Sequence, residues 1–173
     1  TLTDTAVRGF KIGEFTISPG FSSVNVTLPQ GEQWLHMEAL DPSGFPDLAS
    51  DFRKVAVDTV APVISAIGLP NDTGTAGVMG KPELTEDGSG GYTTQVQVTV
   101  GLASDLVGAT VALLKDGSNA GSASLAQVGG DLVATISDVA VAEGSNTFTA
   151  TVTDASGNAS ESSPSAAVVI DIS

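Results

Sequence analysis

Short runs in which apolar and polar residues alternate constrain this chain more than any other feature. Such runs occupy residues 24–28 (VNVTL), 96–100 (VQVTV) and 147–153 (TFTATVT). A period of two places every second side chain on one face of a strand, and Gly, Pro, Asn and Asp residues separate the runs. No segment shows a sustained helical period. The pattern therefore predicts an all-β fold made of many short antiparallel strands.

The amino-acid composition excludes several kinds of site. The 173 residues contain no cysteine, so a disulfide framework, a thiolate nucleophile and a cysteine-ligated zinc ion are all excluded. Only 5% of the residues are aromatic, and Val, Ala, Thr, Ser and Gly are frequent, which favours strands over helices. The length is sufficient for one or two domains of ordinary size.

The charge balance limits the partners of this chain. Six basic residues stand against 20 acidic residues, for a net charge of −14. A surface this acidic repels phosphate backbones, so we expect no nucleic-acid partner. It suits a protein that works outside the cell or one that meets divalent cations. No apolar run approaches membrane-spanning length. Because the chain starts at Thr1 without a methionine, we expect it to be a segment of a longer protein.

An internal repeat relates two parts of the chain. The segment GEQWLHMEALDPSG (31–44) aligns with GSNTFTATVTDASG (144–157) without a gap, at an offset of 113 residues. The offset pairs Asp41 with Asp154, and further along it pairs Asp58 with Asp171. A register that holds through two alternating runs and the loop between them indicates that the two segments are homologous.

Several segments resemble a known family. TVTDASGNAS (151–160), VVID (168–171), VAVDTVAPVIS (55–65) and ATVALLKDGSNAGSASL (109–125) are typical of bacterial immunoglobulin-like repeats, the Big-type domains of large surface proteins and adhesins. The resemblance is clear from residue 58 to 173 and partial before that. It implies tandem immunoglobulin-like antiparallel β-sandwiches that stack end to end and serve in adhesion or as spacers.

The resemblance also implies a division of the chain. Residues 1–58 would form a first, incomplete domain and residues 59–173 a second, complete domain, with a hinge at 59–62. The second domain would contain strands at 63–67, 94–100, 109–114, 121–125, 132–137, 147–153 and 166–172. Residues 69–91 would form a surface loop, either without further structure or with a short extra strand. The first domain has no counterpart of the first two strands. Either the chain begins inside a domain or another chain supplies those strands by strand addition.

Four oxygen-bearing side chains are candidates for a metal site. In a sandwich of this topology the loops at 101–108 and 154–158 lie at the end where the chain enters, which would bring together Asp58, Asp105, Asp154 and Asn158. Calcium binds carboxylate, amide and carbonyl oxygens, and the resemblance implies a calcium site at this position. The alternative is that Asp154 and Asn158 only form a turn without an ion. In the first repeat Phe45 stands where Asn158 does, which removes one oxygen ligand from an equivalent site at Asp41.

A contact patch is a second candidate site. Trp34, His36 and Leu40 fall in the register of Thr147, Thr149 and Thr153, on the outer face of the same strand. They would form a surface for a partner, or a neighbouring loop would cover them. The single histidine has no acid–base partner nearby in the sequence, and no catalytic motif accompanies the serines, so we expect no enzyme.

The expected function is therefore structural. We expect a non-enzymatic structural or adhesive repeat segment of a bacterial cell-surface or secreted protein, which acts as a stiff extender or an assembly module. Its partners would be neighbouring immunoglobulin-like domains and another chain that adds a strand. The alternative is a module that binds protein or carbohydrate beside a secreted enzyme. Either function places the chain outside the cell or on its surface.

Overall fold

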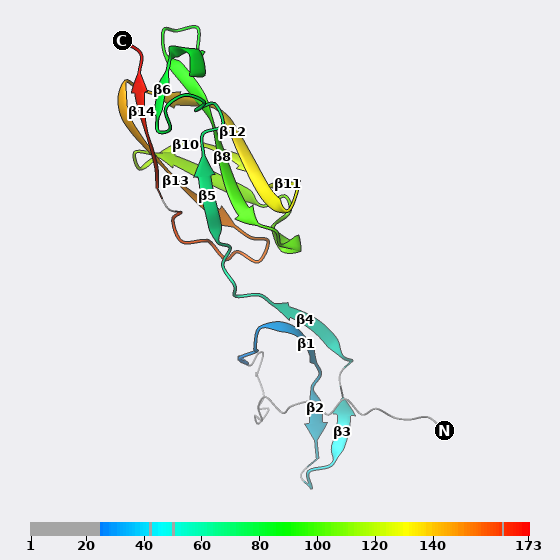
Figure 1. Ribbon diagram of the computed structural model, residues 1–173. Coiled ribbons are helices and arrows are strands. Elements are labelled where there is room, and N and C mark those ends of the chain that lie inside the picture. Colours follow the sequence, from blue (N-terminus) through cyan, green and yellow to red (C-terminus); the bar gives the residue numbers. More distant parts are fainter. Residues whose placement is uncertain (1–24, 42, 50, 164) are drawn as a thin grey trace. The chain divides into compact units, whose positions relative to one another are not determined.

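The computed structural model describes residues 25–41, 43–49, 51–163 and 165–173. The chain divides into two compact units, Thr1–Asp58 and Thr59–Ser173 (Figure 1), and each is described by itself. The expected alternating run at 24–28 forms no strand over its described part, residues 25–28. Val26 in this run is 42% exposed, so the alternation does not place it in a core. The prediction of a strand there is wrong.

The second unit consists almost entirely of strands. They are β5 (Ile64–Gly68), β6 (Val78–Gly80), β7 (Thr85–Glu86), β8 (Tyr92–Gly101), β9 (Thr110–Lys115), β10 (Ser118–Ser124), β11 (Ala126–Val128), β12 (Asp131–Val141), β13 (Gly144–Thr153) and β14 (Ala166–Asp171). The only described helices are two single 3₁₀ turns, η1 (Lys81–Glu83) and η2 (Ser104–Leu106). The prediction of an all-β fold is confirmed.

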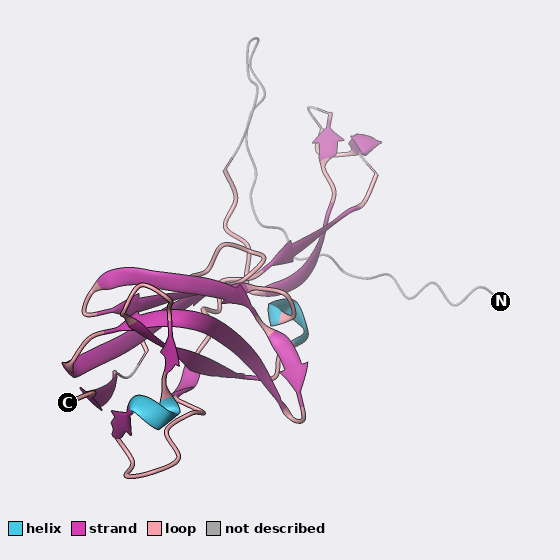
Figure 2. Cartoon of the chain, turned by 90° about the horizontal axis from the view of Figure 1, so that it is seen from above, coloured by secondary structure: helices cyan, strands magenta, loops and turns pink. Residues whose placement is uncertain are grey.

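Two sheets share one core in this unit. One sheet has the strand order β11-β12-β8-β5, with β7 beside β8, and the other has the order β10-β9-β13-β14-β6. Neighbouring strands are antiparallel except β14 and β6, which are parallel. Figure 2 shows these strands in layers. The unit therefore has a sandwich-like arrangement of two sheets.

Alternation in the sequence explains which side chains form the core. Val96, Val98 and Val100 of β8 are at most 1% exposed, and Phe148 and Val152 of β13 are fully buried in the same cluster. The polar residues that alternate with them, Gln97 and Thr99 in β8 and Thr149 and Thr151 in β13, are half-buried. Burying one of the apolar side chains contributes about 1.5–3 kcal/mol, so the two alternating runs together stabilise the contact between the sheets.

Each strand expected in the second unit overlaps an observed one. The short extra strand considered within 69–91 corresponds to β6 or β7, whereas β11 was not expected as a separate strand. The expected surface loop at 69–91 contains β6, η1 and β7. β6 has only three residues and becomes a strand because it pairs with β14, from Val78↔Val169 to Gly80↔Asp171. Its Met79 is fully buried in the core. The pairing partner lies about ninety residues away, so local sequence does not reveal it.

The first unit contains four short strands, β1 (Gly31–Leu35), β2 (Glu38–Leu40), β3 (Pro46–Ala49) and β4 (Arg53–Val57). β1 pairs with β4, and β2 with β3, each pair antiparallel. The described residues of this unit contribute none of the fully buried side chains of the core.

The two units contain the same hairpin. The β1–β4 register starts at Gly31↔Val57, and the β13–β14 register starts at Gly144↔Ile170, so each number differs by 113. The pairing Leu40↔Pro46 likewise corresponds to the bridge Thr153↔Ala159. The repeat in the sequence is therefore also a repeat in strand pairing.

Candidate metal-binding site

Asp154 organises the loop that follows β13. Its Oδ1 accepts hydrogen bonds from the backbone N–H groups of Ser156 (2.9 Å) and Asn158 (2.8 Å). The side-chain amide of Asn158 donates to Oδ2 at 2.9 Å. Gly157 takes a φ of 90°, a left-handed conformation that suits glycine. The Asp residue is only 7% exposed, so these bonds fix the direction of its carboxylate.

The first unit contains the same turn. Oδ1 of Asp41 accepts hydrogen bonds from the backbone N–H groups of Ser43 (2.8 Å) and Phe45 (2.9 Å), and Gly44 has a φ of 84°. Phe45 cannot supply the side-chain bond that Asn158 makes to Asp154. The shared spacing of Asp, Ser and Gly is therefore explained by turn chemistry alone. A cation is not required to close either loop.

Asp105 lies on the short turn η2 between β8 and β9. Leu106, the next residue, is 5% exposed and inserts into the core, while its N–H donates to the carbonyl of Ala103 at 3.2 Å. Gly108 has a φ of 84°, and its N–H donates to the carbonyl of Leu125 at 3.0 Å. The buried leucine and the two backbone bonds hold the turn, and Asp105 stays exposed beside it.

Asp58 follows β4 and precedes the first residue of the second unit. Its Oδ1 accepts a hydrogen bond from Nε2 of Gln30 at 3.1 Å. Four residues later Pro62 is buried, and it is followed by Ile64 at the start of β5. The chain between Asp58 and β5 is thus short.

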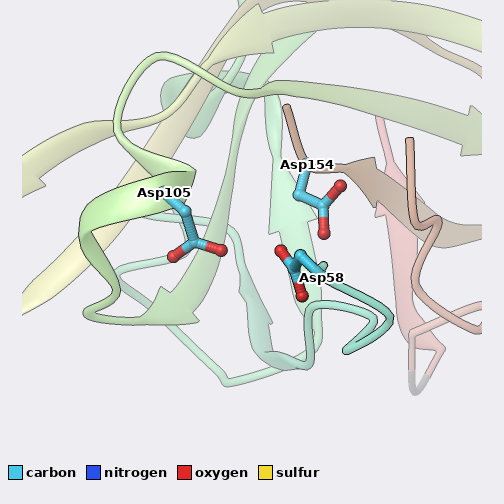
Figure 3. A group of neighbouring side chains, drawn as sticks. All are labelled: Asp58, Asp105 and Asp154. Carbon is cyan, nitrogen blue, oxygen red and sulfur yellow. The ribbon is translucent and has the colours of Figure 1, made fainter. Parts of the chain in front are cut away.

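The carboxylates of the three aspartates lie close together. One carboxylate oxygen from each of Asp58, Asp105 and Asp154 lies within 4.8 Å of the others, and the carboxylates point toward one another (Figure 3). Asn158, the fourth candidate, contacts this group through its hydrogen bond to Asp154. Thus three acidic residues close together could hold a metal ion.

The chemistry of the donors suits a hard cation. All three are carboxylates, and Ca²⁺ and Mg²⁺ prefer oxygen ligands. An ionised carboxylate has about four lone-pair sites, and three hydrogen bonds to Asp154 leave one site for an ion. Two like charges 4 Å apart repel by about 1 kcal/mol in water and about 4 kcal/mol at the effective dielectric constant near a protein surface. A bound cation would remove this repulsion.

The structure places the candidate contact patch on the first unit. Trp34 is 62% exposed, and the exposed His36 makes an edge-to-face contact with Phe52, with ring centroids 4.4 Å apart. Lys54, opposite Trp34 across the hairpin, forms an ion pair with Glu32. Leu40 lies in β2, where side chains are not described. Trp34 and His36 are thus at the surface, and His36 contacts an aromatic ring.

Glu83 is a structural residue that the sequence analysis missed. Its Oε1 accepts hydrogen bonds from the backbone N–H groups of Thr73 (2.7 Å) and Gly74 (2.8 Å), and its Oε2 accepts one from Gly80 at 3.1 Å. These backbone bonds, that of Thr73 above all, lower the pKa of the Glu83 carboxyl. The only sequence signal for this role is a glycine, Gly80, three residues before Glu83. This spacing is too common to indicate a loop anchor.

No protein-family model and no curated protein sequence matches this chain. Within the described residues, no helix has the length and apolar character needed to cross a membrane.

Proposed function

We propose that this chain is a non-enzymatic segment of a bacterial cell-surface or secreted protein, in which immunoglobulin-like modules act as a stiff extender. The repeated hairpin carries the proposal, because β1–β4 and β13–β14 share one register at an offset of 113 residues. Such a repeat is the structural mark of tandem copies of one module. Tandem modules add length to a protein without adding a new fold.

The strand order supports an immunoglobulin-like module. The neighbours β12-β8-β5 correspond to strands E, B and A of such a sandwich, and β9-β13-β14 correspond to strands C, F and G. β6 then extends the second sheet beside the last strand. This correspondence and the sequence resemblance point in the same direction.

The ends of the second unit suit a module that carries tension. Its chain starts at one end of the sheets, and its C-terminus lies at the other (Figure 1). β6, near the start of the unit, runs parallel to the last strand, β14, and the N–H of Val169 donates to the carbonyl of Gly77 at 2.9 Å. Tension along the chain pulls two such parallel strands in opposite directions, so their hydrogen bonds share the load.

Calcium is the cation that we assign to the three aspartates. Extracellular modules bind it at about 10⁻⁴ to 10⁻³ M when few charged ligands contribute. An ion held by Asp58, Asp105 and Asp154 would tie the residue before Thr59 to two loops of the second unit. The ion would thereby stiffen the connection through which load enters the module.

A second candidate function rests on Trp34. This side chain is 62% exposed in β1, whereas its counterpart in the repeat is Thr147. The hairpin forms with either residue, so the fold does not explain the tryptophan. A binding module for protein or carbohydrate beside a secreted enzyme would use such a side chain as an anchor.

The extender is tested by pulling the whole chain between its two ends in an optical trap. We expect the second unit to resist and then open in one step, releasing about 380–410 Å of extended chain from its roughly 115 residues. Gradual lengthening at low force, without a step of this size, would show that the unit does not bear load.

The metal is tested by melting the same chain in millimolar calcium and in chelator. Calcium should raise the melting temperature of the natural chain, since an ion that binds only the folded state stabilises it. Asp105→Asn should remove this response, and Glu161→Gln, which removes one charge at another exposed acid, should retain it. An equal response in both variants would mean that calcium acts as a general counter-ion.

A further inference from the structure

The strand β5, the first of the second unit, buries little of its surface. It pairs with β8 at four positions, and a register shift at Ser65 interrupts this pairing. Ile64 is its one buried side chain, Ile67 is half-buried, and the other three residues are exposed. Among the described strands, β5 lies at the end of its sheet, beside β8. Segments with few buried apolar contacts are the first to open in a folded protein.

The strand β6 is shorter but is fixed at both ends. It pairs with β14 along all three of its residues, and its Met79 is fully buried in the core. Just before β6, the carbonyl of Gly77 accepts a hydrogen bond from the N–H of Val169 at 2.9 Å. At its end, the N–H of Gly80 donates to Oε2 of Glu83 at 3.1 Å. β5 and β6 follow one another in the chain but are therefore held to the unit by separate sets of contacts.

Two carboxylates tie the loop between these strands to β6. Oδ2 of Asp72 accepts a hydrogen bond from the N–H of Gly77 at 2.7 Å. Oε1 of Glu83 accepts bonds from two more backbone N–H groups of the same loop. On the other side of Asp72, Leu69 is partly buried and packs against the core. A movement of β5 can therefore end at residue 69 without disturbing residues 72–80.

We propose that residues 59–68 form a releasable strap, in which β5 leaves β8 in a local opening while β6 stays paired with β14. The buried Leu69 and the hydrogen bonds of Asp72 and Glu83 limit the opening to the strap. In the extender proposed above, load enters the second unit through this strap, and release of the strap lengthens the connection before the core opens. Only that consequence rests on the proposed function; the local opening itself does not.

The test follows amide hydrogen exchange of the full chain by NMR, in the presence of a chelator so that no metal ion holds Asp58. Measurements over a range of low urea concentrations give the free energy of each opening and its dependence on urea. We expect the protected amides of 64–68 to exchange about a hundredfold or more faster than that of Val169, whose bond to Gly77 reports on β6. Their exchange should also depend less on urea, since a local opening exposes less surface.

A crosslinked variant identifies the motion. The chain contains no cysteine, so Ala66→Cys combined with Thr99→Cys introduces one pair of thiols, at opposite positions of β5 and β8. Residues paired in this way are close enough for a disulfide. Oxidation should slow exchange in 64–68 to within about tenfold of that at Val169. The reduced form of the same variant is the matched control and should keep the fast exchange.

Three results would overturn the proposal. Exchange in 64–68 as slow as at Val169 in the natural chain would mean that β5 opens only with the rest of the unit. Exchange at Val169 as fast as in 64–68 would mean that β6 leaves together with β5. Fast exchange in 64–68 after oxidation would mean that separation from β8 is not the motion. The calcium response and the opening step under tension are measured separately, so failure of the strap is distinguishable from failure of the extender.

Discussion

At the scale of single residues, carboxylates in this protein have two different structural roles. Asp41, Asp154 and Glu83 accept backbone N–H bonds and hold loops in place. Asp58 and Asp105 add charge beside Asp154 and turn one of these loops into a candidate cation site. The same residue type thus forms a turn in one repeat, and in the other it forms a turn and is also a candidate metal ligand.

The hydrogen bonds to Glu83 predict a dependence on pH. Because its pKa is lowered from the ordinary 4.5, the folded loop favours the carboxylate. Its contribution to stability is fully present above that ordinary value and is lost as the pH falls through the lower pKa of the folded state. Amide exchange in residues 73–80, corrected for the intrinsic effect of pH, should therefore accelerate on acidification below about 4.5.

Glu83→Gln should produce the same loosening at neutral pH. Its amide nitrogen would present a donor to the N–H of Gly80 or to those of Thr73 and Gly74. Glu86→Gln, a change at an exposed residue in β7, is the matched control. Unchanged exchange in Glu83→Gln would show that the carboxylate does not hold the loop.

At the scale of elements, the edge strand β10 contains an irregularity that the alternation of apolar and polar residues does not predict. β10 changes register against β9 between Asn119 and Gly121. Gly121 has a φ of 137°, and a Cβ atom there would lie 2.9 Å from Cγ2 of Ile136, a core residue of β12. The bulge lets the backbone of β10 approach the opposite sheet closely.

Gly121→Ala should therefore destabilise the second unit. Overpacking of a core position costs about 1–3 kcal/mol, and the positive φ adds backbone strain. The free energy of unfolding in urea, followed by circular dichroism, measures the loss. Gly101→Ala is the control, because that glycine has no atom within 4 Å of the added Cβ and no positive φ. Equal stability of the two variants would show that β10 shifts freely.

At the scale of the whole molecule, the described residues of the two units differ in how many buried hydrophobic side chains they contribute. Among residues whose side chains are described, all the buried hydrophobic ones belong to Thr59–Ser173. In the described part of the first unit, the equivalent hairpin β1–β4 pairs with no further strand. Strand pairing alone does not supply a core, so the two units should differ in stability.

Residues 59–173 expressed alone should unfold cooperatively on heating, with less than about a tenth helix by circular dichroism. Residues 1–58 alone should show no cooperative transition, since a chain of about 60 residues buries little surface. Differential scanning calorimetry of both segments measures this. A cooperative transition of a monomeric 1–58 segment would show that it has a core of its own.

The sequence alone predicts those structural features that depend on residues a few positions apart. Alternation in 96–100 and 147–153 predicted strands and their buried faces, and the Asp-Gly spacing at 154–157 predicted a turn. The repeat also predicted equivalent residues, and strand pairing follows that register. Yet the alternating run at 24–28 forms no strand over its described residues, because alternation requires a partner sheet to bury its apolar face.

Only the tertiary structure determines the features that depend on residues far apart in the sequence. β6 is a strand because β14 lies beside it, and Glu83 is a loop anchor because Thr73 and Gly80 fold around it. The sequence could suggest that Asp58, Asp105 and Asp154 converge, but only the packed loops bring their oxygens within 4.8 Å. Such distances depend on how two sheets pack and where each loop leaves its strand, and these are set by the whole core rather than by neighbours in sequence.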